Sequence, residues 1–299
     1  MPDASETRQM DAAGVAAAVA CCAMWGGNAL AVKYAVPAIP PVGCAAARFA
    51  LALPAVALAC RWTGRPVWPR GGHWGLILGH AILAALQIGA FNWGTGLGEA
   101  GRSSIYINVH PLLIAPLAWV LLGERFGGRG LAGLLAAAAG VAVMLGEKFA
   151  AGGGVAADLI VLAAGGLFAV QTIAQKLTFP VIPPTTLLFA QSAIAFPIAL
   201  AFSLAVEGPG AYHPTASAAS GVIYQGVVVS GVCFAAWFVL LGRYPAGRLA
   251  ALGFLTPLFG VAFGAIARGE PITVPLVIGG GLVALGVTLV ASDKVGTAR

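Results

Sequence analysis

The sequence predicts an all-α polytopic membrane protein with ten transmembrane helices in two inverted five-helix repeats. Of its 299 residues, 60% are apolar and only 9% are charged, whereas soluble domains carry about 25% charged residues. The mean hydropathy is +0.93. The chain also divides into long apolar intervals and repeats itself once. Such a composition cannot cover a water-exposed surface, so soluble enzymes, disordered chains and nucleic-acid binders are excluded.

Ten apolar intervals are each long enough for one membrane-crossing helix, which needs about 20 residues. The first half of the chain holds five of them, at 12–32, 41–60, 74–98, 103–123 and 130–146. The second half holds five more, at 159–175, after Pro183 and Pro184 within 177–206, within 208–242, at 249–267 and at 271–292. The short connections contain proline, glycine and charged residues, as turns do. We therefore expect one integral membrane domain.

Lysines and arginines predict the orientation, because cytoplasmic loops are enriched in them. Of the 16 such residues, Lys33 and Arg48 fall inside spans, and three fall in segments expected outside, Arg102, Lys148 and Arg268. The other eleven fall in segments expected inside. We expect a multi-pass protein of the bacterial inner membrane with both termini in the cytoplasm.

The second half of the chain repeats the first. At an offset of 143 residues, Lys33 falls on Lys176, and the prolines at 37, 40, 41 and 54 fall on those at 180, 183, 184 and 197. At an offset of 146, five further matches follow in order: Arg102 on Arg248, Pro111 on Pro257, Glu124 on Glu270, Gly133 on Gly279 and Gly140 on Gly286. Apolar composition does not pair such rare residues by chance.

The repeats are expected at 1–148 and 149–299. Each unit holds an odd number of helices, so the second must enter the membrane from the opposite side. The result is an inverted repeat, which is typical of secondary transporters with a substrate site near the midplane.

Several short stretches are informative in their order along the chain, and the last of them repeats the one before it in the second half. They are Trp25-Gly26-Gly27-Asn28 with Lys33, Arg48-Phe49, Pro111 with Gly123-Glu124-Arg125, and Pro257 with Gly269-Glu270, where Pro271 replaces the arginine. In these stretches the chain resembles the drug/metabolite transporter superfamily, EamA type. The resemblance covers essentially the whole chain, and its layout is most similar to bacterial amino-acid and metabolite exporters, including the aromatic amino-acid exporters. It implies ten helices, export from the cytoplasm and no ATPase domain.

Two aromatic–amide pairs are the first candidates for substrate binding. Trp25 and Asn28 share a helix face, and at the offset of 143 their counterparts are Phe168 and Gln171, with Gln175 one turn on. Rings can stack on an apolar solute, and amides can bond a carboxylate or an ammonium group. The alternative is that the amides bond backbone groups freed by neighbouring glycines.

Other polar and aromatic residues inside spans are further candidates, because such residues are often functional. They are His80, Gln87, Tyr106, His110, Tyr224 and Trp237. Either histidine would suit a substrate carboxylate or proton uptake. The alternative is a hydrogen bond between helices for the histidines and simple packing for the aromatic residues.

Four residues are candidates for gates or hinges. Lys33 and Arg48 lie a few residues from the outer helix ends, where they either attract anionic groups at a gate or extend to the interface. Pro111 and Pro257 would each remove a mid-helix hydrogen bond and kink helices at equivalent points. Glu124 and Glu270 suit helix capping or pairing with a nearby arginine better than catalysis.

The sequence therefore favours a secondary transporter that exports small metabolites, most of all amino acids. The alternatives are an exporter of cationic drugs and, less favoured, a channel. An enzyme is not expected, because the spans lack paired carboxylates and clustered metal ligands, and no phosphate-binding loop for ATP is present. The expected partners are a small solute and the lipid bilayer, without nucleic acid, an ATPase subunit, a cofactor or a metal, in a monomer or weak oligomer.

Overall fold

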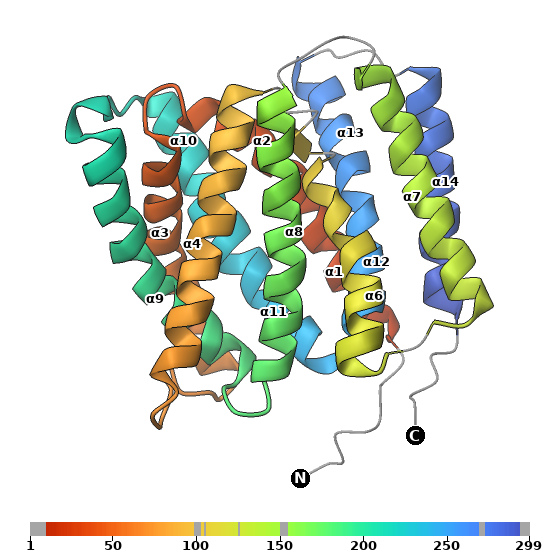
Figure 1. Cartoon of the computed structure of the whole chain (residues 1–299), viewed down its shortest axis with the longest axis horizontal. Coiled ribbons are helices and arrows are strands. Elements are labelled where there is room, and N and C mark those ends of the chain that lie inside the picture. The colour runs from red at the N-terminus through yellow and green to blue at the C-terminus, as the bar shows by residue number, and fades with distance from the viewer. Residues whose placement is uncertain are drawn as a thin grey trace.

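The computed structural model describes residues 10–98, 103–104, 106–124, 126–149, 155–268 and 273–293. In these ranges the chain is helical and has no strand, and the helices stand side by side (Figure 1). Six of them are long and apolar enough to cross a membrane, and four shorter apolar helices lie among them. Some residues singled out from the sequence lie outside these ranges: Arg8, Gly101, Arg102, Arg125, Gly269, Glu270, Pro271, Lys294 and Arg299.

The helices follow the ten predicted intervals. The first repeat contains α1 (Ala12–Gly26), α2 (Asn28–Ala35), α3 (Pro41–Trp62), α4 (Trp74–Leu97), α6 (His110–Leu122) and α7 (Gly128–Phe149). The second contains α8 (Val155–Thr178), α9 (Pro184–Phe202), α10 (Ala216–Ile223), α11 (Phe234–Arg243), α12 (Ala246–Leu252), α13 (Thr256–Arg268) and α14 (Val274–Ser292). Four of the spans consist of two segments each: α1–α2, the turn before α6 with α6, α10–α11 and α12–α13.

Contacts between helix ends show that the repeats run in opposite directions. α3 begins at the upper end of the molecule as drawn in Figure 1. There Glu207, which follows α9, accepts hydrogen bonds from the N–H groups of Val42 at 3.0 Å and Gly43 at 3.1 Å. α9 begins at the lower end, where Thr185 Oγ1 lies 3.2 Å from Thr63 Oγ1, which follows α3. The second helices of the two repeats are therefore antiparallel.

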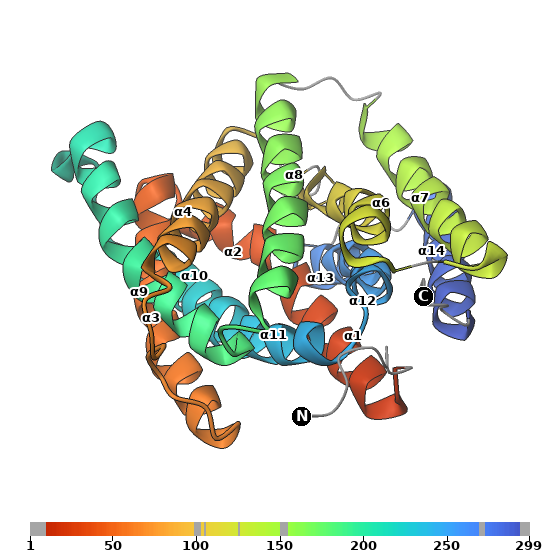
Figure 2. The same ribbon diagram turned by 60° about the horizontal axis from the view of Figure 1, so that its bottom comes forward.

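The last helices of the two repeats, α7 and α14, pair through glycines (Figures 1 and 2). A Cβ atom on Gly133 would lie 2.6 Å from the carbonyl oxygen of Gly286, and one on Gly140 would lie 2.5 Å from that of Gly279. Since the residue number rises along one helix and falls along the other, this pair is also antiparallel. Glycines at these positions let the two helices approach closely.

Equivalent helices of the two repeats are interrupted at the same point. In the first repeat, a 3₁₀ turn at Ile107–Val109 precedes α6, and in the second a 3₁₀ turn at Gly253–Leu255 precedes α13. Pro111 and Pro257 are the second residues of α6 and α13. The expected mid-helix kinks are thus helix starts, where proline is tolerated because the first N–H groups have no partner within the helix.

Two other interruptions occur in one repeat only. The first predicted span is broken at Gly27, between α1 and α2. The neighbouring Gly26 lets α13 approach closely, because a Cβ atom there would lie 2.7 Å from Phe259 Cβ. In the second repeat, wide π-helical turns at Tyr224–Cys233 join α10 to α11. Such turns often occur at functional sites.

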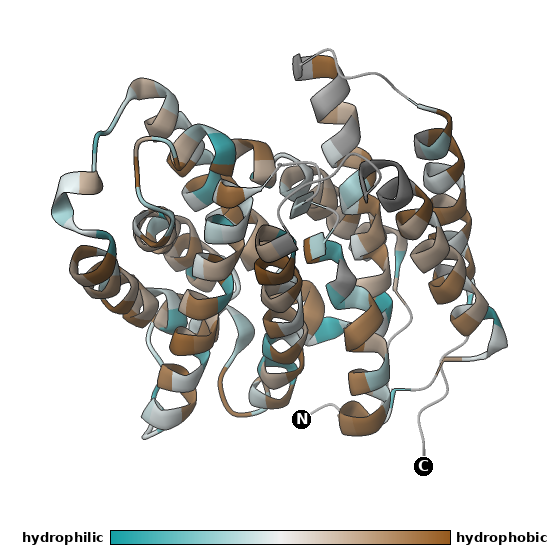
Figure 3. Ribbon diagram, turned by 45° about the horizontal axis from the view of Figure 1, so that its top comes forward, coloured by the Kyte–Doolittle hydropathy of each residue, from teal (hydrophilic) through white to brown (hydrophobic). Residues whose placement is uncertain are grey.

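The outer sides of the bundle are apolar, as Figure 3 shows by colour. Large apolar side chains there are highly exposed: Leu86, Trp119, Leu135, Leu159, Ile266 and Val277. An apolar surface of this extent is expected to face lipid rather than water. The protein is therefore a multi-pass membrane protein.

Candidate functional site

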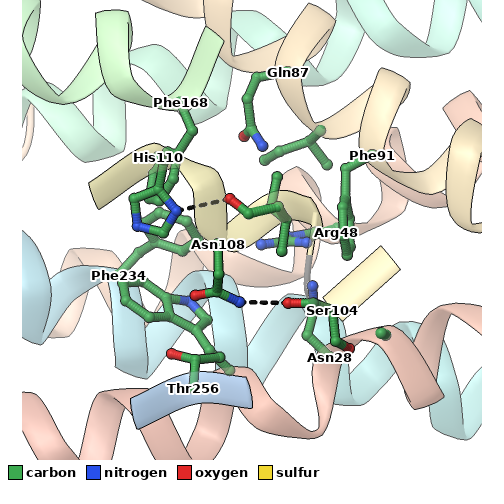
Figure 4. A pocket seen from close by; sticks show the side chains of 14 residues that line it. Asn28, Arg48, Gln87, Phe91, Ser104, Asn108, His110, Phe168, Phe234 and Thr256 are labelled. Atoms are coloured by element: carbon green, nitrogen blue, oxygen red, sulfur yellow. Dashed lines mark hydrogen bonds between the residues drawn. The ribbon is translucent and has the colours of Figure 1, made fainter. Parts of the chain in front are cut away.

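A cavity lies between the two repeats (Figure 4) and is called the upper cavity here. Its volume is about 580 Å³, counting the open space at its mouth. Helices α1 to α4, the turn before α6 and the start of α6 line it from the first repeat, and α8, α11 and α13 line it from the second. The interrupted spans thus converge on it. Discontinuous helices at equivalent points of two repeats mark the binding site in many transporters.

Aromatic rings form one wall of the upper cavity. Trp25 and Phe168, predicted as counterparts, meet edge to face with ring centroids 6.2 Å apart. Phe234 packs on both, at 5.4 Å from Trp25 and 6.2 Å from Phe168. Phe234 is itself the counterpart of Phe91 at the offset of 143 residues, and Phe91 also lines the cavity. Two symmetric aromatic pairs therefore surround the space.

The predicted amides are divided between two cavities. Asn28 lines the upper cavity together with Gln87. Gln171 lines a smaller cavity of about 310 Å³, called the lower cavity. Gln87 and Phe234 line both and so stand between them. Gln175 is buried, but within the described part of the chain it contributes to neither cavity.

Some equivalent positions of the two repeats are divided between the two cavities. At the offset of 143 residues, Asn28 corresponds to Gln171 and Arg48 corresponds to Gln191. The first member of each pair lines the upper cavity and the second lines the lower cavity. Arg48 comes seven residues after the start of α3 at the upper end, and Gln191 comes seven residues after the start of α9 at the lower end. The cavities are therefore displaced toward opposite ends of the molecule.

Arg48 carries the positive charge of the upper cavity. Its side chain is 3% exposed, and its Nε atom donates a hydrogen bond to Ser230 Oγ. The guanidinium carbon lies 5.6 Å from the centroid of the Phe234 ring. The Arg48 side chain thus stays inside the bundle and does not extend to the membrane interface. The position of Arg48 in the sequence was compatible with both directions.

The two candidate histidines lie in different surroundings. His110 lines the upper cavity, with its ring 4.6 Å from that of Phe168. Its Nδ1 atom lies 2.8 Å from the carbonyl oxygen of Ile107. Because a carbonyl oxygen can only accept, Nδ1 carries the proton and donates this hydrogen bond. His80 bonds Thr178 Oγ1 at 2.9 Å and so links α4 to α8 outside both cavities. For His80, the structure therefore shows the hydrogen bond between helices that the sequence offered as the alternative to a role in transport.

Three aromatic candidates pack behind the site. Tyr224 donates its hydroxyl hydrogen to the carbonyl oxygen of Met24 at 2.7 Å, next to the break at Gly27. Trp237 is 3% exposed and stacks behind Trp25, with centroids 4.6 Å apart. Tyr106 is buried in an apolar cluster. These side chains support the walls of the upper cavity.

Lys33 and Lys176, counterparts in the two repeats, cap helix ends. Lys33 Nζ donates to the carbonyl oxygen of Gly98 at 2.7 Å, at the end of α4. Lys176 Nζ donates to the carbonyl oxygens of Leu241 at 2.5 Å and Tyr244 at 2.6 Å, at the end of α11. Glu124 likewise caps the start of α12, accepting from Ala246 N–H at 2.7 Å and Gly247 N–H at 2.8 Å. The expected capping role of Glu124 is confirmed.

The sequence interpretation missed several lining residues. Asn108 donates from Nδ2 to the carbonyl oxygen of Ser104 at 2.5 Å, and both residues line the upper cavity. Thr256 lines it from the second repeat and is the counterpart of His110 at the offset of 146 residues. The signal that would have found Thr256 is its place directly before the repeated proline.

Comparison with known families decides the family of this chain. The EamA-like transporter family matches residues 12–146 and residues 155–292, one match in each repeat. The chain belongs to the EamA-like transporter family. This family is part of the drug/metabolite transporter superfamily that the motifs resemble.

Relatives of this EamA-like transporter cover most of its length. A protein of Escherichia coli (strain K12), named a probable amino-acid metabolite efflux pump, is 29% identical over 84% of this chain and 85% of its own. A probable terminal-alkyne amino-acid exporter of Streptantibioticus cattleyicolor is 28% identical over 75% of this chain and 74% of its own. An uncharacterized transporter of Archaeoglobus fulgidus is 24% identical over 90% of this chain and 95% of its own.

A solved crystal structure shares the fold of this EamA-like transporter. It matches with a TM-score of 0.77 over 94% of this chain and 98% of the solved chain, at 22% sequence identity. At that identity the match speaks for the fold alone.

Proposed function

We propose that this transporter exports small metabolites, amino acids in particular, by alternating access without ATP hydrolysis. The observation that carries the proposal is the pair of cavities between which some equivalent positions of two inverted repeats are divided. Repeats of similar fold and opposite orientation can exchange conformations. In that exchange the upper cavity closes and the lower cavity opens, so that one site faces each side in turn.

The aromatic wall supplies the barrier between the two cavities. Phe234 and Gln87 line both spaces, and the Trp25–Phe168 pair joins the two repeats where they meet. A solute passing from one cavity to the other must displace these side chains. We infer that a concerted shift of the repeats, taken as 1–148 and 149–299, moves them.

The lining of the upper cavity supports a small organic solute. Aromatic and apolar side chains line it together with several polar groups, as in sites for small molecules. Two relatives carry names that refer to amino-acid export. The apolar rings suit an apolar or aromatic body, and the amides suit its polar groups. The lysine and arginine distribution supports a location in the cytoplasmic membrane with both termini inside.

Export of cationic drugs is the alternative with less support. Among the described residues that line the upper cavity, Arg48 is charged positively and none is an aspartate or glutamate. A cation would therefore lose its hydration without gaining a counter-ion.

A counterflow assay in proteoliposomes tests the proposal. Labelled amino acids are offered outside vesicles that are loaded with the unlabelled compound, and saturable accumulation driven by the internal compound is expected. Flux that never saturates would indicate a channel, and absence of exchange across a broad panel of amino acids, nucleosides and cationic drugs would contradict transport.

We predict that Trp25→Ala lowers the exchange rate by about tenfold or more, because it removes the ring that links the aromatic wall across the repeats. Trp119→Ala is the matched control, since Trp119 is 60% exposed on the outer side of α6. Equal exchange by the two variants at equal membrane yield would remove Trp25 from the transport path.

A further inference from the structure

We propose that the solute in the upper cavity carries one carboxylate, which pairs with Arg48, and that it needs no ammonium group. This inference rests on the proposed transport function and adds the charge of the solute. It also separates two solute classes that family membership leaves together, acids and amines.

Arg48 is a buried cation that has no counter-ion in the part of the chain that the structure describes. Its Nε atom is engaged by Ser230, while its Nη groups have no hydrogen-bond partner among the described residues. Within those same residues no carboxylate lies within ion-pair distance of the guanidinium. The guanidinium also lies over the face of the Phe234 ring.

An unpaired guanidinium in a membrane interior is unfavourable unless it meets water or an anion. Arg48 lines the upper cavity, so a solute there reaches it directly (Figure 4). The planar fork of N–H donors matches a carboxylate, and such charge-assisted bonds are the strongest type available to the site.

The other described polar side chains that line the upper cavity are neutral, so Arg48 alone sets the charge expected of the solute. They are amides, hydroxyls and an imidazole whose Nδ1 donates to the carbonyl oxygen of Ile107: Asn28, Gln87, Ser104, Asn108, His110 and Thr256. One cation balances one negative charge, so a monocarboxylate fits the site. The acceptors that the described lining offers an ammonium group are uncharged, namely Asn28 Oδ1 and His110 Nε2, which have no partner among the described residues. A carboxylate therefore gains more from the guanidinium than an amine gains from these atoms.

The second repeat shows that this charge is particular to one cavity. The counterpart of Arg48 is Gln191, whose side chain is 4% exposed and whose Oε1 atom has no partner among the described residues. The lower cavity therefore offers an amide where the upper cavity offers a guanidinium. We infer that the carboxylate is held more tightly in the state in which the upper cavity is open.

Binding of three matched compounds to the purified full-length protein tests the proposal. They are 3-phenylpropanoate, which is an acid without an amine, phenylalanine, and phenylalaninamide, which is a cation without a carboxylate. Tryptophan fluorescence reports binding, because Trp25 lines the cavity. We expect 3-phenylpropanoate to bind at least as tightly as phenylalanine, and phenylalaninamide to bind about tenfold more weakly or not at all. Absence of a preference for the carboxylates would overturn the proposal.

Variants of Arg48 place the preference on this side chain. Arg48→Gln is expected to abolish the difference between 3-phenylpropanoate and phenylalaninamide, and Arg48→Lys to weaken carboxylate binding by about tenfold, since an ammonium replaces the planar fork. Arg61→Gln is the matched control, because Arg61 is an exposed arginine in the last turn of the same helix and lines neither cavity among the described residues. If Arg48→Gln does not fold, the Arg48→Lys result decides, and unchanged affinity there overturns the proposal.

The counterflow assay separates this inference from the proposed function. Exchange in the assay, together with binding that does not depend on the carboxylate, overturns the inference alone. Carboxylate-dependent binding without any exchange overturns the transport function alone.

Discussion

Buried polar side chains in this transporter fall into two groups according to what they bond. One group satisfies the backbone at helix ends: Lys33, Lys176, Glu124 and Glu207 bond the last carbonyls or the first N–H groups of neighbouring helices. Helix ends carry such groups without a partner in the helix, and inside a membrane these need one. The other group, with Arg48 at its centre, faces a cavity. The charged residues that stabilise helix ends are thus distinct from Arg48, which is available to a solute in the upper cavity.

The lysine pair gives a prediction at the residue scale. Lys33→Met should lower the free energy of unfolding by about 1–3 kcal/mol, because it leaves buried carbonyls without a charged donor. Lys176→Met should have a similar effect at the other end of the molecule. Thermal unfolding in detergent measures both. A Lys33→Met protein with normal thermal stability but an altered KM would instead make Lys33 a gate residue.

The sequence predicted some of these residues and missed others for definite reasons. Trp25 and Phe168 were found because both fall at the same point of the repeat. The depth of Arg48 was not predictable, since counting from a helix end does not reveal whether a long side chain points inward or toward the interface. Phe234 was missed because it follows π-helical turns. These turns shift the side-chain register, which an i, i+4 pattern does not detect.

At the scale of elements, two antiparallel helix pairs hold the repeats together. α7 and α14 meet through glycines. α3 and α9 pack side by side, with the Glu207 contact at one end of the pair and the Thr63–Thr185 contact at the other. The existence and order of the spans were predictable from their apolar intervals. Their interruptions were not predicted correctly. The repeated prolines suggested mid-helix kinks, whereas they lie at the starts of α6 and α13 after 3₁₀ turns.

The α7–α14 contact gives a prediction at this scale. Gly140→Leu should destabilise the protein by about 2 kcal/mol or more, because even a Cβ atom there would lie 2.5 Å from the carbonyl oxygen of Gly279, and a packed backbone yields little. Gly281→Ala on α14 is the control, since no atom lies within 4 Å of its added Cβ. Melting temperatures in detergent compare the two. Equal melting temperatures would show that the two helices are not tightly packed in the membrane.

At the scale of the whole molecule, the opposed direction of the repeats makes alternating access possible, and it also fixes which loops share a side. The loop after α3 lies at the lower end, and the loop after α9 lies at the upper end. Equivalent loops of the two repeats therefore face opposite sides of the membrane. Two observations lead to this arrangement. Each repeat has five spans, and the contacts at the two ends of the α3–α9 pair show that these helices are antiparallel.

Cysteine labelling in whole cells tests this topology. Gly72 and Gly210 lie in the two loops, and a Cβ atom at either position meets no atom within 4 Å. The five native cysteines are all buried, so background labelling should be low. With the positive charge of the lower loops inside, a membrane-impermeant maleimide should label Gly210→Cys in intact cells and Gly72→Cys only after lysis. Labelling of both in intact cells would place the two loops on one side, and the repeats would then lack the opposed orientation on which an exchange of conformations depends.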